Sequence, residues 1–222
     1  MQEELLVIRM RIPVAASIVL ILLAFISGFV FSQQVPEQMA THWDASGNVN
    51  GYMPKFWGLF FMPILMAMAA SLMYFFPMID PLRKNVEMFR EYYDVFIALL
   101  MGFLLLVHLQ TLLWNTGTEI DPGITVSLGL AILMVYIGIM MGKAKRNWFI
   151  GIRTPWTLSS DEVWDRTHAL GSKLFMAAGL IVALGTFIPQ YRFALVILPV
   201  LAAAIVPAVY SYLEFRKLRP KA

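Results

Sequence analysis

The sequence predicts an all-α membrane protein, a bundle of six transmembrane helices with both termini in the cytoplasm. Apolar side chains make up 59% of the 222 residues, and charged side chains make up 14%, whereas about a quarter of the residues in a soluble protein are charged. Six apolar runs approach the ~20 helical residues that cross a hydrocarbon core of ~30 Å. Lysine and arginine also concentrate in alternate connections between these runs, and this alternation indicates the orientation.

The apolar runs predict helices at about 12–32, 56–79, 92–114, 124–142, 172–189 and 193–213. The first run, from Ile12 to Phe31, is longer than the apolar core of a secretory signal, so we expect it to be retained as a helix. Three prolines lie inside the second and sixth runs, where a missing backbone donor can kink a helix: Pro63, Pro199 and Pro207.

The 17 lysines and arginines predict which connections face the cytoplasm. Fourteen of them precede the first run, follow the last run, or lie in the connections after the second and fourth runs, and a fifteenth, Lys173, lies where the fifth run begins. Only Lys55 and Arg192 lie on the other side. Because cytoplasmic connections carry the excess of lysine and arginine, residues 33–55 are predicted to face the outside and residues 143–171 the cytoplasm. We therefore expect a multi-pass protein of the cell membrane whose general partner is the lipid bilayer.

The long connections divide the chain into two predicted halves. Residues 1–122 hold three helices and the structured external loop 33–55, and residues 123–222 hold three helices and the cytoplasmic motif 143–171. The absence of cysteine excludes disulfides and thiolate chemistry. No basic patch with interleaved aromatic residues stands apart from the membrane segments, so no nucleic acid partner is expected.

The external loop carries turn residues and several candidate binding side chains. Glycine and asparagine at 47–48 and 50–51 favour tight turns, which predicts a structured loop. One interpretation is a lid whose aromatic residues anchor at the membrane interface. The other is a ligand-binding site, and its candidate residues are His42, Trp43, Asp44, Asn48 and Tyr52.

A metal ion is a further hypothesis for the external side. His42 and Asp44 could chelate zinc only together with a third group. His108 in the third helix is one candidate, because an ionisable group inside a span is costly, and Glu119 in the next external turn is another. The alternative for His108 is a neutral imidazole that bonds to a neighbouring helix.

The cytoplasmic motif begins with "GKAKRNWFIGIRTPW", residues 142–156. The Thr154-Pro155 step favours an extended or turn conformation at Thr154. We expect a short segment on the inner membrane interface, with Trp148, Phe149, Ile150 and Trp156 facing lipid or helix ends. Arg146 and Arg153 are then expected to reach lipid phosphates, and Arg153 and Trp156 are candidate ligand-binding residues.

The motif continues into a predicted helix start. Ser159 to Glu162 has the S-x-x-E form of a capping box, and Glu162 with Arg166 forms an i, i+4 pair. On the helix that follows, one face carries Asp161, Asp165, His168 and Ser172. Three interpretations of this face stay open: a solvated or salt-bridged surface, a binding face for a cytoplasmic partner, and a set of metal ligands.

The same stretch resembles the SdpI family, membrane proteins named for immunity to a secreted sporulation-delaying toxin. The resemblance rests on Gly142-Lys143, on residues 147–159, on Val163-Trp164 and on Thr167-His168. The external stretch "PEQMATHWDASGNVNGYMPK" is similar to the domain of unknown function that usually forms the front half of such proteins. The resemblance implies six helices, protection against an antimicrobial peptide toxin, and retention of a small cytoplasmic repressor-like protein at the membrane.

Three functions are therefore considered. The first is immunity to, or sensing of, a secreted peptide toxin through the external loop, with relay to a cytoplasmic partner. The second is a membrane-embedded, zinc-dependent peptidase in which Glu162, Asp165 and His168 are candidate catalytic residues. The candidate metal ligands of that peptidase are His42, Asp44, His108, Asp161 and His168. The third is a small transporter, which the lack of acidic residues deep in the spans disfavours.

The predicted orientation can be measured with reagents that do not cross membranes. Because the chain has no cysteine, one introduced cysteine supplies a unique probe. A probe near Trp156 should stay unlabelled in intact cells, and a probe within residues 33–55 should be labelled. Labelling near Trp156 before the membrane is permeabilised would reverse the orientation.

Overall fold

The computed structural model describes residues 2–218, with side chains described from residue 12 to residue 218. Six helices in this part of the chain are long and apolar enough to cross a membrane. They are α1 (Gln2–Phe31), α2 (Lys55–Phe75), α4 (Arg90–Asn115), α5 (Pro122–Met141), α7 (Asp161–Gly185) and α8 (Arg192–Leu218). The predicted fold class, an all-α membrane protein with six spans, is confirmed.

Two of the spans begin earlier than the apolar pattern predicts. Helix α1 begins at Gln2 rather than near residue 12, and α7 begins at Asp161 rather than near residue 172. Apolar runs mark the part of a helix inside hydrocarbon, but a helix can continue into water wherever its backbone is capped. Four short helical segments complete the helical inventory of the described chain: η1 (Phe76–Met78), α3 (Arg83–Glu87), α6 (Pro155–Ser159) and η2 (Pro189–Tyr191).

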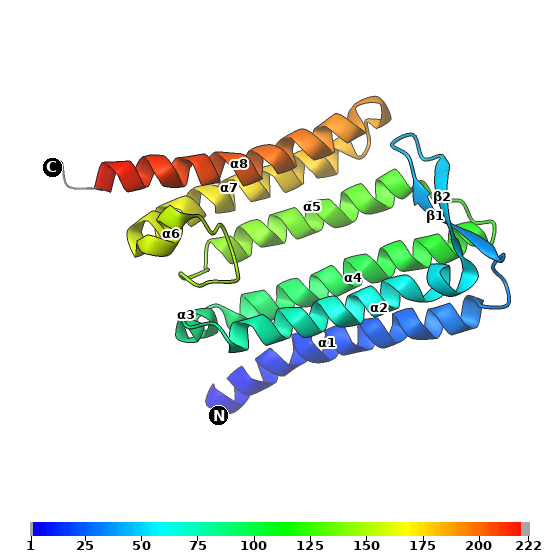
Figure 1. The fold of residues 1–222 in the computed structure, drawn as a ribbon, viewed down its shortest axis with the longest axis horizontal. Helices are drawn as coiled ribbons and strands as arrows, with labels where there is room; N and C mark the ends of the chain where they lie inside the picture. Colours follow the sequence, from blue (N-terminus) through cyan, green and yellow to red (C-terminus); the bar gives the residue numbers. More distant parts are fainter. Residues whose placement is uncertain (1, 219–222) are drawn as a thin grey trace. The chain divides into compact units, whose positions relative to one another are not determined.

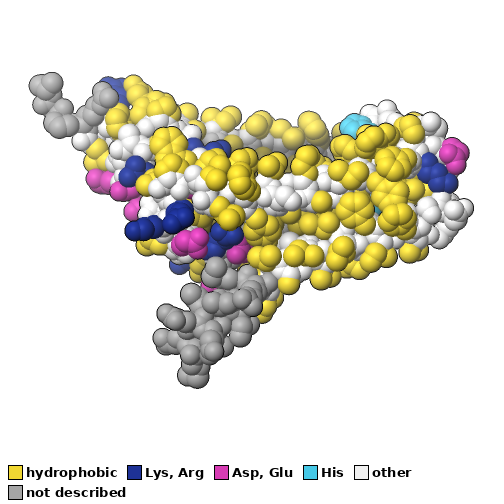
Figure 2. All heavy atoms as spheres, turned by 60° about the horizontal axis from the view of Figure 1, so that its bottom comes forward, with side chains coloured by type: hydrophobic (Ala, Val, Ile, Leu, Met, Phe, Trp, Pro, Cys, Tyr) yellow, Lys and Arg dark blue, Asp and Glu magenta, His cyan; other side chains and the backbone are white. Residues whose placement is uncertain are grey.

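Large apolar side chains are exposed along the spans. Leu180 and Leu184 of α7 and Leu198 of α8 are 62%, 70% and 64% exposed. On the face drawn in Figure 2, apolar side chains cover the middle of the helices, and Lys, Arg, Asp and Glu gather near helix ends. Contiguous apolar surface of this kind needs an apolar solvent, which lipid supplies.

The chain forms two compact units. The first contains Met1–Met73 and Ile97–Gly129, and the second contains Tyr74–Phe96 and Leu130–Ala222. Helices α4 and α5 each contribute to both units. The predicted boundary near residue 122 separates sequence halves rather than these spatial units, and it stays a prediction.

In the first unit, α1, α2 and the C-terminal part of α4 run alongside one another (Figure 1). Gly28 of α1 allows a close approach, because a Cβ there would lie 3.0 Å from the Leu59 carbonyl oxygen of α2. The rings of Phe29 and Phe60 pack with centroids 4.9 Å apart. In α4, the His108 ring bonds to the Ala24 carbonyl of α1 at 3.2 Å.

The predicted structured loop is a β-hairpin of β1 (Gln38–Trp43) and β2 (Val49–Pro54). Asn115, at the end of α4, fixes β1 by accepting a hydrogen bond from the Ala40 N–H and donating one to the Ala40 carbonyl, both at 2.8 Å. Beneath the hairpin, Val35, Met39, Leu59 and Leu112 form a buried apolar cluster. The amide clamp and this cluster together hold the hairpin on the helices of its own unit.

In the second unit, α7 and α8 pack along their lengths (Figure 1), and α5 contacts α7 through glycine. A Cβ on Gly138 would lie 2.6 Å from the Ser172 carbonyl oxygen, and one on Gly179 would lie 2.7 Å from the Ala131 carbonyl oxygen. Small residues let helix backbones approach closely in membranes, where helices gain no hydrophobic energy by associating. The closeness of α5 and α7 therefore depends on the missing side chains.

Gly138→Ala should lower the thermal stability of the purified protein, because the added methyl group meets the backbone of α7. We expect a loss of about 1–3 kcal/mol, measured by thermal unfolding in one detergent. Gly102→Ala is the matched control, since the nearest atom to its Cβ is Leu20 Cδ1 at 4.0 Å. Equal stability of the two variants would contradict the close packing of α5 and α7.

Candidate functional site

The connection between α5 and α7, residues 142–160, has an irregular backbone held by the buried side chain of Asn147. The Asn147 amide donates to the carbonyls of Lys145 and Ile150 at 2.8 and 3.0 Å. Its oxygen accepts from the N–H groups of Phe149 and Ile150 at 3.0 and 2.6 Å. Asn147 is fully buried, so this one side chain satisfies four backbone groups that no helix or sheet satisfies.

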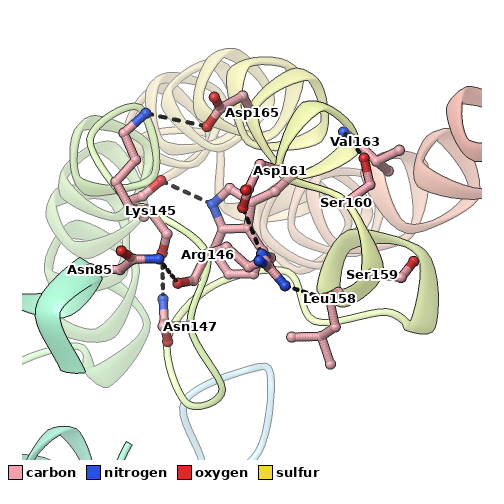
Figure 3. Close-up of polar contacts among 12 residues, drawn as sticks. Asn85, Lys145, Arg146, Asn147, Leu158, Ser159, Ser160, Asp161, Val163 and Asp165 are labelled. Carbon is pink, nitrogen blue, oxygen red and sulfur yellow. Dashed lines mark hydrogen bonds and ion pairs between the residues drawn. The ribbon is translucent and has the colours of Figure 1, made fainter. Parts of the chain in front are cut away.

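Two residues of the connection between α2 and α4 also hold this segment. The buried Asp80 carboxylate accepts from the Trp148 N–H at 2.9 Å and from the Leu82 N–H at 2.7 Å. The Asn85 side chain donates to the Arg146 carbonyl at 2.8 Å (Figure 3). The α5–α7 connection is therefore fixed to a second stretch of chain as well as to itself.

Ion pairs join the start of the connection to the polar face of α7 (Figure 3). Arg146 Nε lies 2.6 Å from an Asp161 oxygen, and Arg146 also donates to the Leu158 carbonyl at 2.8 Å. Lys145 Nζ lies 3.4 Å from Asp165. The two carboxylates of the predicted stripe thus face basic residues, as the salt-bridged interpretation describes.

His168, the third residue of the stripe, is buried with both ring nitrogens engaged. Its Nε2 accepts from the Ile152 N–H at 3.1 Å, so its Nδ1 carries the proton and donates to the Trp164 carbonyl at 2.9 Å. The ring stacks on Trp164 at a centroid distance of 4.0 Å. Gly151 is required opposite the ring, because its φ of +109° favours glycine and a Cβ there would meet His168 Nε2.

The helix start after the connection is capped one residue later than the S-x-x-E pattern predicts. Ser160 is the N-cap of α7, and its hydroxyl accepts from the Val163 N–H. Ser159 instead ends α6. A capping box does form at the start of α6: the Thr154 hydroxyl accepts from the Thr157 N–H, and the Thr157 hydroxyl accepts from the Thr154 N–H. The Thr154 hydroxyl also bonds to the Ser211 hydroxyl of α8 at 2.9 Å, which the local pattern could not indicate.

Arg166 connects α7 to α8. It pairs with Glu162 at 2.6 Å, as the i, i+4 spacing predicts, and with the buried Glu214 of α8 at 2.7 Å. Lys217 Nζ lies 2.6 Å from the other Glu214 oxygen. A buried carboxylate needs such partners because an unpaired charge there is costly.

The expected interfacial placement of the motif is only partly observed. Trp148 is 49% exposed, but Ile150 is buried because it lies next to Asn147 inside the connection. Phe149 stacks on Phe76 at 5.1 Å, and Trp156 packs on Tyr212 at 5.0 Å. Arg153 is exposed and donates to the Trp148 carbonyl at 2.9 Å.

The candidate metal ligands do not assemble into a donor set. Among the residues whose side chains are described, no three His, Asp or Glu groups lie close enough to hold a metal ion. The two nitrogens of His168 are occupied, and Asp161 and Asp165 face Arg146 and Lys145. Zinc does not fit these residues as they are arranged, so the geometry offers no support for the alternative hypothesis of a peptidase.

The hairpin turn is organised by Asp44. Its carboxylate accepts from the N–H groups of Ser46 and Asn48 at 2.8 and 3.0 Å. Backbone hydrogen bonding from Asn48 is the largest cause that lowers the pKa of Asp44 below its usual value of 3.8, and bonding from Ser46 also lowers it. The ionised Asp44 carboxylate therefore stabilises the turn at pH values above its usual pKa. This stabilisation is lost as the pH falls through the lower pKa that Asp44 has in the folded protein.

The other hairpin candidates take different positions. His42 bonds through Nδ1 to the Asn50 side chain, and Trp43 packs edge-on against Trp114 at 5.4 Å. Tyr52 is 62% exposed. Of the more distant candidates, His108 is buried against α1 and Glu119 is exposed. The predicted alternative for His108, a ring bonded to a neighbouring helix, is the observed arrangement.

Three buried polar residues were not among the candidates: Asp80 and Asn147 hold the connection, and Glu214 pairs with Arg166 of α7. Each is a polar residue near the end of a span, and each is at most 3% exposed. Glu214 precedes Arg216 and Lys217 in an otherwise apolar helix, and an ionisable residue inside a span is a signal that could have identified it.

Six helices long and apolar enough to span a membrane, with a polar connection between α5 and α7, make this a multi-pass membrane protein. Residues 143–211 match the SdpI/YfhL protein family, and residues 19–67 match a domain of unknown function (DUF1648). The resemblance predicted from the motif is thus confirmed, because the part of the chain that carries the motif matches the SdpI/YfhL family.

A curated relative extends the match to most of the chain. The protein is 28% identical over 204 residues to "Immunity protein SdpI" of Bacillus subtilis (strain 168), which covers 91% of this chain and 95% of that protein. No solved structure is significantly similar to this chain.

Asn147→Ala should expose the connection to trypsin, because four backbone groups lose their partner. We expect a loss of about 3 kcal/mol from the unsatisfied buried groups, with cleavage at Lys145, Arg146 and Arg153 several-fold faster in detergent. Asn85→Ala removes one hydrogen bond to the connection and should cost about 1 kcal/mol. Equal cleavage rates for Asn147→Ala and the unchanged protein would show that Asn147 does not hold the connection in place.

Proposed function

We propose that this protein gives its host immunity to a secreted antimicrobial peptide toxin. The observation that carries the proposal is the similarity to "Immunity protein SdpI", which spans nearly the whole of both chains. Because the similarity includes both the hairpin region and the α5–α7 connection, the two proteins share the parts from which a binding site would be built.

The hairpin is the proposed contact surface for the toxin. Its turn is ordered by Asp44 and its strand β1 is clamped by Asn115, so little ordering would be needed on binding. Tyr52, Phe56 and Trp57 are 62%, 58% and 49% exposed at the hairpin and the start of α2. Exposed aromatic side chains on a fixed backbone suit the apolar face of a membrane-active peptide.

The α5–α7 connection is the proposed contact for a cytoplasmic partner. The polar residues of its interior are occupied by hydrogen bonds, and the exposed Trp148 and Arg153 remain for a partner. Relay of toxin binding requires two arrangements with different affinities for the toxin. We propose this relay together with an orientation in which the hairpin faces the outside of the cell.

Tyr52→Ala should reduce protection of a sensitive bacterium that expresses the full chain. We expect about a tenfold fall in the concentration of sporulation-delaying toxin that halves growth, because an exposed aromatic anchor is lost. The matched control is Tyr191→Ala, because Tyr191 is also a tyrosine with 62% exposure but lies in η2, away from the hairpin. Immunoblots of membrane fractions establish equal amounts of each variant.

Arg153→Ala separates the two proposed surfaces. It changes the α5–α7 connection and should leave protection intact. Loss of protection with Arg153→Ala but not with Tyr52→Ala would move the toxin site to the connection. Failure of the unchanged protein to protect against this and other secreted peptides would overturn the immunity proposal itself.

A further inference from the structure

A pocket of about 390 Å³ lies between the C-terminal end of α5 and the face of α7 that it packs against. This volume falls within the range of small-molecule sites. Three lysines line it, Lys143, Lys145 and Lys173, with one carboxylate, Asp165. The pocket belongs entirely to the second unit and has no part in the proposed toxin contact.

The positive charge of the pocket is only partly neutralised. Asp165 lies 3.4 Å from Lys145. Among the described side chains, neither Lys143 nor Lys173 forms an ion pair. His168 also lines the pocket but is neutral, because its Nε2 accepts from a backbone N–H. Two lysine ammonium groups therefore remain without a counter-charge at one concave site.

The C-terminal end of α5 supplies only a partial negative charge, and several of its carbonyls already accept hydrogen bonds. The Gly138 carbonyl accepts from the Gly142 N–H at 3.3 Å, and the Met140 carbonyl accepts from the N–H groups of Lys143 and Ala144, both at 3.0 Å. The Trp164 indole donates to the Ala144 carbonyl at 3.0 Å. These carbonyls of the helix end are already used, so the lysines and the Ser172 hydroxyl set the polarity of the pocket.

The pocket lies where two helices pass from polar to apolar sequence. Lys143 comes two residues after the end of α5, and Lys173 comes where the apolar part of α7 begins. Met141 and Met176 add apolar lining beside the lysines. The pocket thus combines ammonium groups with apolar side chains near the ends of apolar helix segments, and this is the combination that an anionic phospholipid requires.

We propose that this pocket binds a phosphate-bearing anion, held by Lys143 and Lys173. The phosphate could belong to the headgroup of an anionic lipid or to a soluble phosphate, since both offer the same oxygens to the ammonium groups. Basic pockets between transmembrane helices bind anionic headgroups in this manner.

Native mass spectrometry of the full chain tests the proposal. The protein is titrated with phosphatidylglycerol, with phosphatidylcholine of the same acyl chains, and with inorganic phosphate or glycerol phosphate as competitors. Lys143→Gln/Lys173→Gln should retain phosphatidylglycerol about tenfold less well or worse. Arg83→Gln/Lys84→Gln is the matched control, because it removes the same charge from exposed residues elsewhere in the second unit.

A second variant tests the pocket by shape instead of charge. Ala169 lines the pocket and is exposed, so Ala169→Phe should occupy the space and weaken phosphatidylglycerol retention with all lysines present. Competition by inorganic phosphate or glycerol phosphate at equal concentration would assign the site to a soluble phosphate, and no competition would assign it to the lipid. Equal loss in the Arg83/Lys84 control, or equal retention of phosphatidylcholine, would overturn the proposal.

Discussion

Asn147 makes four hydrogen bonds to the backbone around it, and the shape of the α5–α7 connection depends on them. Backbone that is neither helix nor sheet carries donors and acceptors that need partners, and near a bilayer water cannot always supply them. Asp80 and His168 accept two further N–H groups of the same connection, those of Trp148 and Ile152. Between these two spans, side chains thus supply the hydrogen bonds that a helix would supply through its own backbone.

The hairpin uses the same physical solution on a smaller scale. Asn115 bonds both backbone groups of Ala40, and Asp44 satisfies the N–H groups of the turn. In the connection the side chains that set the backbone are buried, whereas in the hairpin turn Asp44 does so from an exposed position. Because polar side chains in both segments are occupied by backbone groups, polarity alone is a poor guide to binding residues.

Much of the architecture followed from local patterns. Apolar length predicted six spans, and turn residues predicted order in the stretch that forms the hairpin. The Glu162–Arg166 pair followed from helical spacing, because i, i+4 neighbours meet on any helix. The position of the α7 cap was wrong by one residue, since Ser159 and Ser160 are both good caps and the choice depends on where α6 ends. Arg146 was expected at lipid phosphates but instead pairs with Asp161.

The sequence by itself determined the class of the protein, its six spans and its family motif, because hydropathy and residue order act over short stretches and need no knowledge of distant partners. Only the tertiary structure decided which polar side chains hold the α5–α7 connection. Asp80 and Trp148 are 68 residues apart, and Thr154 and Ser211 are 57 apart. No local pattern relates such residues. Their contact arises when helices pack, since a buried donor or acceptor bonds to whichever group the packing brings within reach.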